Sequence, residues 1–352
     1  MYTPILRNRR SEMLGLSDIQ SDVQSLMMPL FDVAAPTKRA DQEKAEKYVI
    51  NNIVRTEKIA KGFGSVFVDS SELDPVFRLP GNIHPLSAAA AAVSTAGATA
   101  IPVTGLHRDA AHHQAALDAT DPFAGLICIR LDATDVGTAR LTYKGIKDVV
   151  QAAGVNSMQV FLLLDMQCLH GLEPGDVVKP VNRLILLLNE QNWAGIIVGG
   201  YGMPEQLSTA VQTKEQAYLP RVEQKMFNSL NSHSLKSPLW FADYTVLPPS
   251  VVELDWRLIG RVMSPKALYA LEDTWLVVRG GAFSSHPDGY DQYFSIAEEI
   301  VALDEYSGVG YSAGDDYIAD KALHVGKPGS PASWITACVN HHVTLTARTH
   351  SA

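Results

Sequence analysis

Eight short apolar runs recur along residues 4 to 244, and most of them precede a stretch of helix-forming composition. Parallel strands need crossover connections of about a dozen residues or more, which are usually helical. Strands buried on both faces read as continuous apolar runs. The alternation therefore predicts an α/β fold, and eight units predict a TIM-like (β/α)8 barrel. The runs are Pro4 to Leu6, Pro29 to Val33, Ser65 to Asp69, Thr99 to Val103, Gly125 to Leu131, Val160 to Asp165, Gly195 to Gly199 and Leu239 to Asp243.

Two of the connections make specific predictions. Residues 11–26 carry apolar side chains at spacings of three or four, which predicts one crossover helix. Residues 201–218 form a long polar loop, and long loops at strand ends are often lids or binding loops.

The rhythm of runs and helices stops near Thr245. We expect residues 1–250 to form the barrel and residues 251–352 to form a C-terminal α+β elaboration packed on it. This part contains one apolar strand at 274–281 and one helical pattern at 293–303. The remainder has no clear period, but its tyrosines and Trp334 provide apolar surface, which predicts a tail folded over the barrel.

Composition restricts the functional class. The 352 residues include 29 basic and 38 acidic side chains, a net charge of −9, which argues against nucleic acid as the main ligand. The longest apolar stretches are far shorter than the roughly 20 residues of a membrane span, and no secretion signal is recognisable. We expect a soluble, cytoplasmic protein. Three cysteines are too few for a disulfide framework.

Charged residues gather where the runs end. Carboxylate oxygens suit Mg²⁺ or another divalent cation, and arginine grips phosphate through two bonds. These residues predict metal ligands at Asp69, Asp165 and Asp243, and contacts to an anionic ligand at Arg7, Arg9 and Arg130. The alternative is that the aspartates only cap the following helices. The whole set is Asp32, Asp69, Asp132, Asp165, Asp243, Arg7, Arg9, Arg10 and Arg130.

Histidines cluster after the fourth run and near the C-terminus. A histidine pair can supply a general base or metal ligands. If His341 and His342 lie in an alternating strand, they point to opposite faces and only one faces a pocket. None of the motifs HExxH, GxSxG, Walker A or GxGxxG is present in the sequence.

The chain also resembles a known family over nearly its whole length. The residues that carry the resemblance are YTPILRNRRSEMLGL at the start, PLFDV, WFADYTVLPPS at 240–250, WLVVRGG at 275–281, YSGVGYSAGDDYIAD at 306–320 and WITACVNHHVT at 334–344. With these motifs the sequence is similar to the Beta protein family, named after a protein of temperate satellite phages.

This resemblance implies a barrel-like fold and a role in phage defence or toxin control, with a protein partner encoded in the same module. It implies no established reaction. Matching the motifs residue by residue adds Arg279, Asp315 and Asn340 as ligand-binding positions, and His341 and His342 as catalytic ones. A buried hydrogen-bond network that ties the tail to the barrel is the alternative role for Asn340 and the histidines.

Three functional hypotheses follow. The first is a regulatory or sensor component of an anti-phage or toxin-control module, whose barrel mouth binds an anionic small molecule or a partner protein. The second is a metal-dependent phosphodiesterase or nuclease that uses strand-end aspartates, with Asp165 and Asp243 as catalytic residues, and one C-terminal histidine. The third is a purely structural barrel whose mouth is plugged by the tail and whose outer helices bind a partner.

Overall fold

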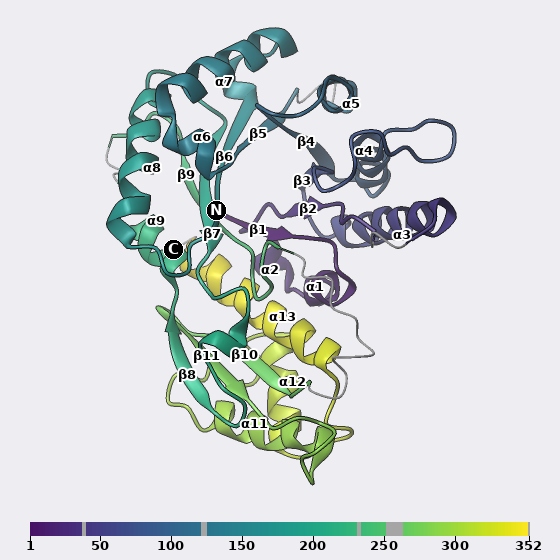
Figure 1. Ribbon diagram of the computed structural model, residues 1–352, viewed down its shortest axis with the longest axis vertical. Helices are drawn as coiled ribbons and strands as arrows, with labels where there is room; N and C mark the ends of the chain where they lie inside the picture. The colour runs from purple at the N-terminus through teal and green to yellow at the C-terminus, as the bar shows by residue number, and fades with distance from the viewer. Residues whose placement is uncertain (37–39, 121–124, 231–233, 251–262, 351–352) are drawn as a thin grey trace.

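A closed barrel of parallel strands forms the larger part of the chain in a computed structural model that describes residues 1–36, 40–120, 125–230, 234–250 and 263–350 (Figure 1). The strands neighbour one another in the order β1-β2-β3-β4-β5-β6-β7-β9, so the predicted (β/α)8-type barrel is confirmed. Their bounds are β1 (Tyr2–Leu6), β2 (Leu30–Asp32), β3 (Ser65–Asp69), β4 (Thr99–Gly105), β5 (Ile127–Leu131), β6 (Val160–Cys168), β7 (Gly195–Tyr201) and β9 (Leu239–Asp243).

Helices connect these strands and cover the outside of the barrel. They are α1 (Arg10–Gly15), α2 (Ser21–Gln24), α3 (Gln42–Ala60), α4 (Pro85–Thr95), α5 (Ala110–Asp118), α6 (Ala133–Gly137), α7 (Ala139–Ala153), α8 (Pro174–Leu188) and α9 (Val222–Asn228). Short 3₁₀ turns lie at η1 (Ser157–Gln159), η2 (Leu207–Thr209) and η3 (Gly289–Asp291). The single helix predicted over residues 11–26 is wrong: α1 ends at Gly15 and α2 begins at Ser21, because Gly15, Ser17 and Asp18 are weak helix formers.

A smaller lobe packs against the barrel and contains the C-terminal part of the chain. Its antiparallel sheet has the order β10-β11-β8, with β8 (Gln216–Pro220), β10 (Lys266–Ala270) and β11 (Thr274–Arg279). Its helices are α11 (Gln292–Val301), α12 (Ala313–Ala322) and α13 (Pro331–Thr349). The strand predicted at 274–281 and the helix predicted at 293–303 are both confirmed.

The small sheet takes its third strand from the connection between β7 and β9. The polar loop predicted at 201–218 therefore contributes β8, which pairs with β11 from Thr274↔Pro220 to Val278↔Gln216. Residues before position 250 thus belong to both parts of the molecule, and the division at residue 250 stays a prediction.

Helix α13 lies between the two parts and buries side chains on opposite sides. It packs against α1 and β1 of the barrel and against β10 and α12 of the small lobe (Figure 1). The expectation of a strand around His341 and His342 is therefore wrong. In a helix, consecutive side chains are about 100° apart, so the two histidines face different neighbours. The tail is folded against the barrel, as predicted. Within the described ranges, we find no helix with the length and apolar character needed to cross a membrane.

Candidate functional site

The carboxyl ends of the barrel strands surround a cavity of about 290 Å³, which we call the mouth cavity. Its wall includes Asp32 from β2, Arg130 from β5, Asp165 from β6, Tyr244 just after β9, and Arg108 from the loop after β4. Barrels of this type carry their sites at this end of the strands. Four of the nine strand-end charges predicted from the sequence therefore line the place where a site is expected: Asp32, Arg130, Asp132 and Asp165.

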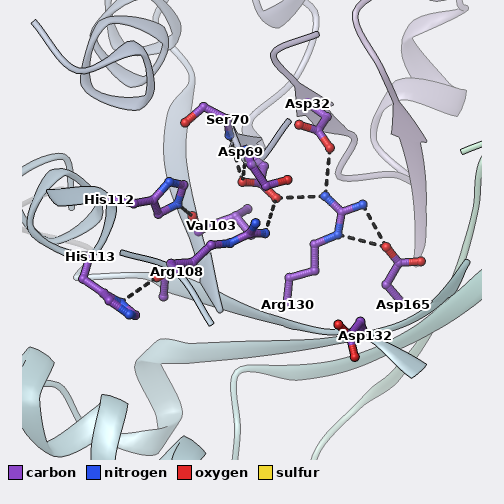
Figure 2. A network of polar contacts seen from close by, with 12 residues as sticks. Asp32, Asp69, Ser70, Val103, Arg108, His112, His113, Arg130, Asp132 and Asp165 are labelled. Atoms are coloured by element: carbon purple, nitrogen blue, oxygen red, sulfur yellow. Dashed lines mark hydrogen bonds and ion pairs between the residues drawn. The ribbon is translucent and has the colours of Figure 1, made fainter. Parts of the chain in front are cut away.

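Arg130 is the centre of this arrangement (Figure 2). Its Nη1 donates to Oδ2 of Asp32 at 2.9 Å and to Oδ2 of Asp69 at 2.8 Å. Its Nε and Nη2 donate to Oδ2 of Asp165 at 2.9 and 2.8 Å. Nη2 also donates to the hydroxyl of Tyr244, which in turn donates to Oδ2 of Asp165 at 2.6 Å. One guanidinium thus holds three carboxylates from three strands, and we call these five residues the Arg130 network.

The strand register explains which acids enter the network. Asp165 pairs with Gly199, and Gly199 pairs with Ala242, so Ala242 shares the inward face of Asp165. Successive side chains of a strand point to opposite faces. Asp243 therefore points away from the barrel interior, and Tyr244 points inward again and contacts Asp165.

The pKa values of Asp32 and Asp69 in the Arg130 network are shifted in opposite directions. Burial, together with the negative charge of nearby Asp69, raises the pKa of Asp32 to about 7. Burial acts in the same direction on Asp69, but Arg108 and Arg130 outweigh it and lower the pKa of that carboxyl. The backbone N–H groups of Ser70 and Ser71 add to this by donating to Oδ1 of Asp69 at 2.8 and 3.0 Å. Two neighbouring carboxyls with pKa values shifted apart are typical of functional sites.

Asp32 is also incompletely bonded. It is 2 % exposed, and only its Oδ2 contacts Arg130. Its Oδ1 is buried and has no hydrogen-bond partner among the residues that the structure describes. A buried polar atom without a partner is destabilising by about 1–3 kcal/mol.

The other charged residues predicted at the strand ends lie outside the Arg130 network. Arg7 is buried and forms an ion pair with Glu72, beside the mouth. Arg9 precedes the first turn of α1, and its backbone N–H donates to Glu12. Asp132 caps α6 by accepting from the N–H groups of Thr134 and Asp135, as the capping alternative predicts, although it also lines the mouth cavity.

Asp243 belongs to a second buried cluster, between the barrel and the small lobe. Its Oδ1 accepts from the hydroxyl of Tyr2 at 2.6 Å and its Oδ2 lies 2.8 Å from Nε2 of His342. Arg221, which is fully buried, lies 3.7 Å from the same oxygen. Burial opposes ionisation of Asp243, but His342, Arg221 and Tyr2 outweigh it and lower its pKa to about 2.

The remaining predicted residues lie inside the small lobe or at its junction with the barrel. His341 Nδ1 lies 2.9 Å from Oδ2 of Asp315, and its Nε2 lies 2.8 Å from the carbonyl of Ala270. Asn340 accepts from the N–H of Gly314 in α12 and donates to the carbonyl of Gly15 in α1. The Nη1 group of Arg279 donates to the carbonyl of Val211. This is the hydrogen-bond network that the sequence suggested as the alternative to catalysis.

The three carboxylates predicted to hold a divalent cation do not come together. Asp69 and Asp165 share the guanidinium of Arg130, whereas Asp243 faces His342 on the other side of the strand. In the part of the chain that the structure describes, no group of three His, Cys, Asp or Glu side chains is arranged to hold a metal ion. The residues present therefore do not fit the predicted metal centre.

A family model described as Beta protein matches residues 2–348. The chain belongs to the Beta protein family. A search of curated proteins found no match. Family membership covers the barrel and the small lobe together, and thus both the Arg130 network and the Asp243 cluster.

The sequence did not predict Tyr244 and Arg108, which both contact carboxylates of the Arg130 network. Tyr244 follows Asp243 directly, and the alternation along β9 indicates that the two point in opposite directions. Arg108 lies 3.2 Å from Oδ2 of Asp69 and comes from the β4–α5 loop, in the sequence LHRD. A loop arginine gives no periodic signal, so only the fold brings it to the mouth.

Proposed function

We propose that this Beta family protein binds a small polar molecule in the mouth cavity and acts as the recognition component of a phage-defence or toxin-control module. The observation that carries the first part is the Arg130 network, which opens onto a cavity at the strand ends. The role in the module rests on family membership and on what the family resemblance implies.

Stability alone does not account for such a network. Buried ion pairs are often no more stabilising than well-packed apolar residues of the same volume, because each charge loses its hydration. The Arg130 network includes three buried carboxylates around one guanidinium, and one oxygen of Asp32 has no partner within the part of the chain that the structure describes. The cavity is close to the lower end of the ~300–1,000 Å³ range of small-molecule pockets. Charged side chains retained at a cavity of this size support a binding site.

The competing hypothesis of a metal-dependent phosphodiesterase or nuclease has less support, since its three aspartates do not meet. The third hypothesis, a barrel closed by the tail, also has less support. Helix α13 packs beside the barrel, and the mouth cavity is present.

The test is a substitution that fills the mouth cavity and leaves the side chains of the Arg130 network unchanged. Ser71 is half-buried in the cavity wall, and its hydroxyl makes no hydrogen bond to another described residue. Ser71→Trp therefore places a large side chain in the mouth cavity. Ser94→Trp, at an exposed position of α4, is the matched control. The assay is a thermal-shift measurement with a panel of small cations, anions and neutral polyols. We expect some of these molecules to raise the Tm of the wild type and of Ser94→Trp, and not that of Ser71→Trp.

The same pair of variants tests the biological role. In cells that carry the whole module, Ser71→Trp is expected to change the efficiency of phage plating, or the toxicity of the partner, while Ser94→Trp has no effect. Equal behaviour of both variants in binding and in cells contradicts the proposal.

A further inference from the structure

The charge of the mouth cavity restricts the kind of molecule that it binds. Six carboxyl groups line the cavity against two arginines and one histidine, and Glu72 among the six is paired with Arg7. Arg130 already contacts three carboxylates, and Arg108 contacts Asp69. A cleft lined mainly by one sign of charge, with walls of low dielectric constant, concentrates ligands of the opposite sign. This balance favours a cation over the anionic ligand expected from the sequence.

Asp32 provides the atom that such a cation needs. Its carboxyl is buried in the cavity wall, and Arg130 contacts only Oδ2. Oδ1 lacks a hydrogen-bond donor within the described residues. Because Oδ1 is buried, a ligand N–H group contacts it only after a rotation of the Asp32 carboxyl towards the cavity. The ligand would then satisfy an acceptor that has no partner among the described residues, and a charged donor would form the stronger bond.

We propose, resting on the function proposed above, that the ligand of the mouth cavity is a small organic cation, an amine or a guanidine, whose N–H group donates to Oδ1 of Asp32. An organic cation fits better than a divalent metal ion, because a single free carboxylate oxygen does not make a coordination shell. The cavity volume corresponds to about ten water molecules at ~30 Å³ each, which is enough for a short diamine.

Binding of this kind depends on pH through Asp32. The charged or titratable groups that face Asp32 are Asp69 and Glu72 from β3 and the loop after it, Arg130 from β5 and Tyr244 after β9. Arg130 stays charged and Tyr244 stays neutral near neutral pH, because the pKa of each lies well above its ordinary value. The pKa of Asp69 is lowered, so that carboxyl is already ionised. Asp32, with a pKa of about 7, changes charge between pH 6 and pH 8.

The experiment uses three four-carbon probes that differ only in their end groups: putrescine with two ammonium groups, 1,4-butanediol with two hydroxyls, and succinate with two carboxylates. Calorimetry on the full chain is expected to detect putrescine binding and no binding of the other two. From the ionised fraction of a group with a pKa of about 7, affinity at pH 6 is expected to be about tenfold lower than at pH 8.

Variants assign the contact to Asp32. Asp32→Asn keeps the shape of the side chain and is expected to lower putrescine affinity roughly 30-fold and to abolish its pH dependence. The matched control is Asp304→Asn, an exposed acid of the small lobe, which should bind as the wild type does. Ser71→Trp should abolish binding even where Asp32→Asn only weakens it.

The outcomes separate this inference from the proposed function. Binding of succinate or butanediol that Ser71→Trp abolishes, without binding of putrescine, supports the mouth as a site and overturns the assignment of a cation. Stabilisation by Mg²⁺ or Ca²⁺ that requires both Ser71 and Asp32, again without putrescine binding, overturns it in favour of a metal. Putrescine binding that is unaffected by Ser71→Trp overturns it as well, because the cation then binds elsewhere.

Discussion

The protonation of Asp32 gives a stability prediction that is independent of any ligand. Its pKa in the folded protein is about 7, whereas an unfolded chain gives about 3.9. For a group whose pKa is raised by folding, the contribution to stability is present below the unfolded value and is lost as pH rises towards the folded value. Ionisation of Asp32 therefore destabilises the native state between about pH 4 and pH 7.

The size of the effect follows from the two pKa values. Each pKa unit corresponds to about 1.4 kcal/mol, so at pH 8 a buried Asp32 makes the fold about 4 kcal/mol less stable than a neutral isostere would. At pH 5, where most folded molecules keep the proton, the difference is about 1–2 kcal/mol. Asp32→Asn is therefore expected to stabilise the free protein, and its advantage should grow by roughly 2–3 kcal/mol from pH 5 to pH 8.

Urea unfolding of wild type and Asp32→Asn at several pH values measures this difference directly. Far-UV circular dichroism of both proteins checks that the fold is unchanged. If Asp32→Asn is less stable than wild type by the same amount at pH 5 and at pH 8, Asp32 is an ordinary ion-pair partner of Arg130 and the reasoning fails. A stabilising variant that loses ligand binding would show that Asp32 is retained for function at the expense of stability.

Two further predictions concern the contacts between the barrel and the small lobe. Asp243→Asn is expected to lower the free energy of unfolding at pH 7 by about 2–3 kcal/mol, because His342 and Arg221 hold the pKa of Asp243 at about 2. That stability is present above about pH 4 and is lost as pH falls towards 2, so the free energies of unfolding of wild type and variant should converge at acid pH. The putrescine affinity of Asp243→Asn at pH 8 should equal that of the wild type. Gly314→Ala is expected to destabilise the protein by about 1–3 kcal/mol in urea unfolding, since its Cβ would lie 2.2 Å from the carbonyl oxygen of Ala337 and would force α12 away from α13. Wild-type stability of Gly314→Ala would refute the close packing of these helices.

The sequence was sufficient to predict the barrel because its strands are buried on both faces and read as apolar runs. It also placed Asp32, Asp69 and Asp165 at the strand ends, and these three acids do meet. The direction of Asp243 was predictable too, because residues of a strand alternate between faces, and Ala242 and Tyr244 must share the face opposite to it.

The small lobe was harder to predict, for physical reasons. Helix α13 packs against the barrel on one side and against the small sheet on the other, so its apolar residues do not follow the one-sided period that identifies most helices. Strand β8 alternates between exposed and half-buried residues, and it pairs with β11, more than fifty residues further along the chain. The sequence near α13 and β8 does not show which distant elements these two segments pack against or pair with.

The network around Asp315 and His341 differs from the Arg130 network in one respect that bears on function. In the small lobe, Asp315 accepts from the hydroxyl of Tyr269 on Oδ1 and from the hydroxyl of Ser312 on Oδ2, and Oδ2 also lies 2.9 Å from Nδ1 of His341. Both carboxylate oxygens are bonded, and both ring nitrogens of His341 face an oxygen. A fully bonded buried network makes a structure rigid and specific. In the Arg130 network, by contrast, Oδ1 of Asp32 has no hydrogen-bond partner among the described residues, and Asp32 lines the mouth cavity. Because an unpaired buried acceptor is destabilising, a ligand that pairs with it gains binding energy that the satisfied network of the small lobe does not offer.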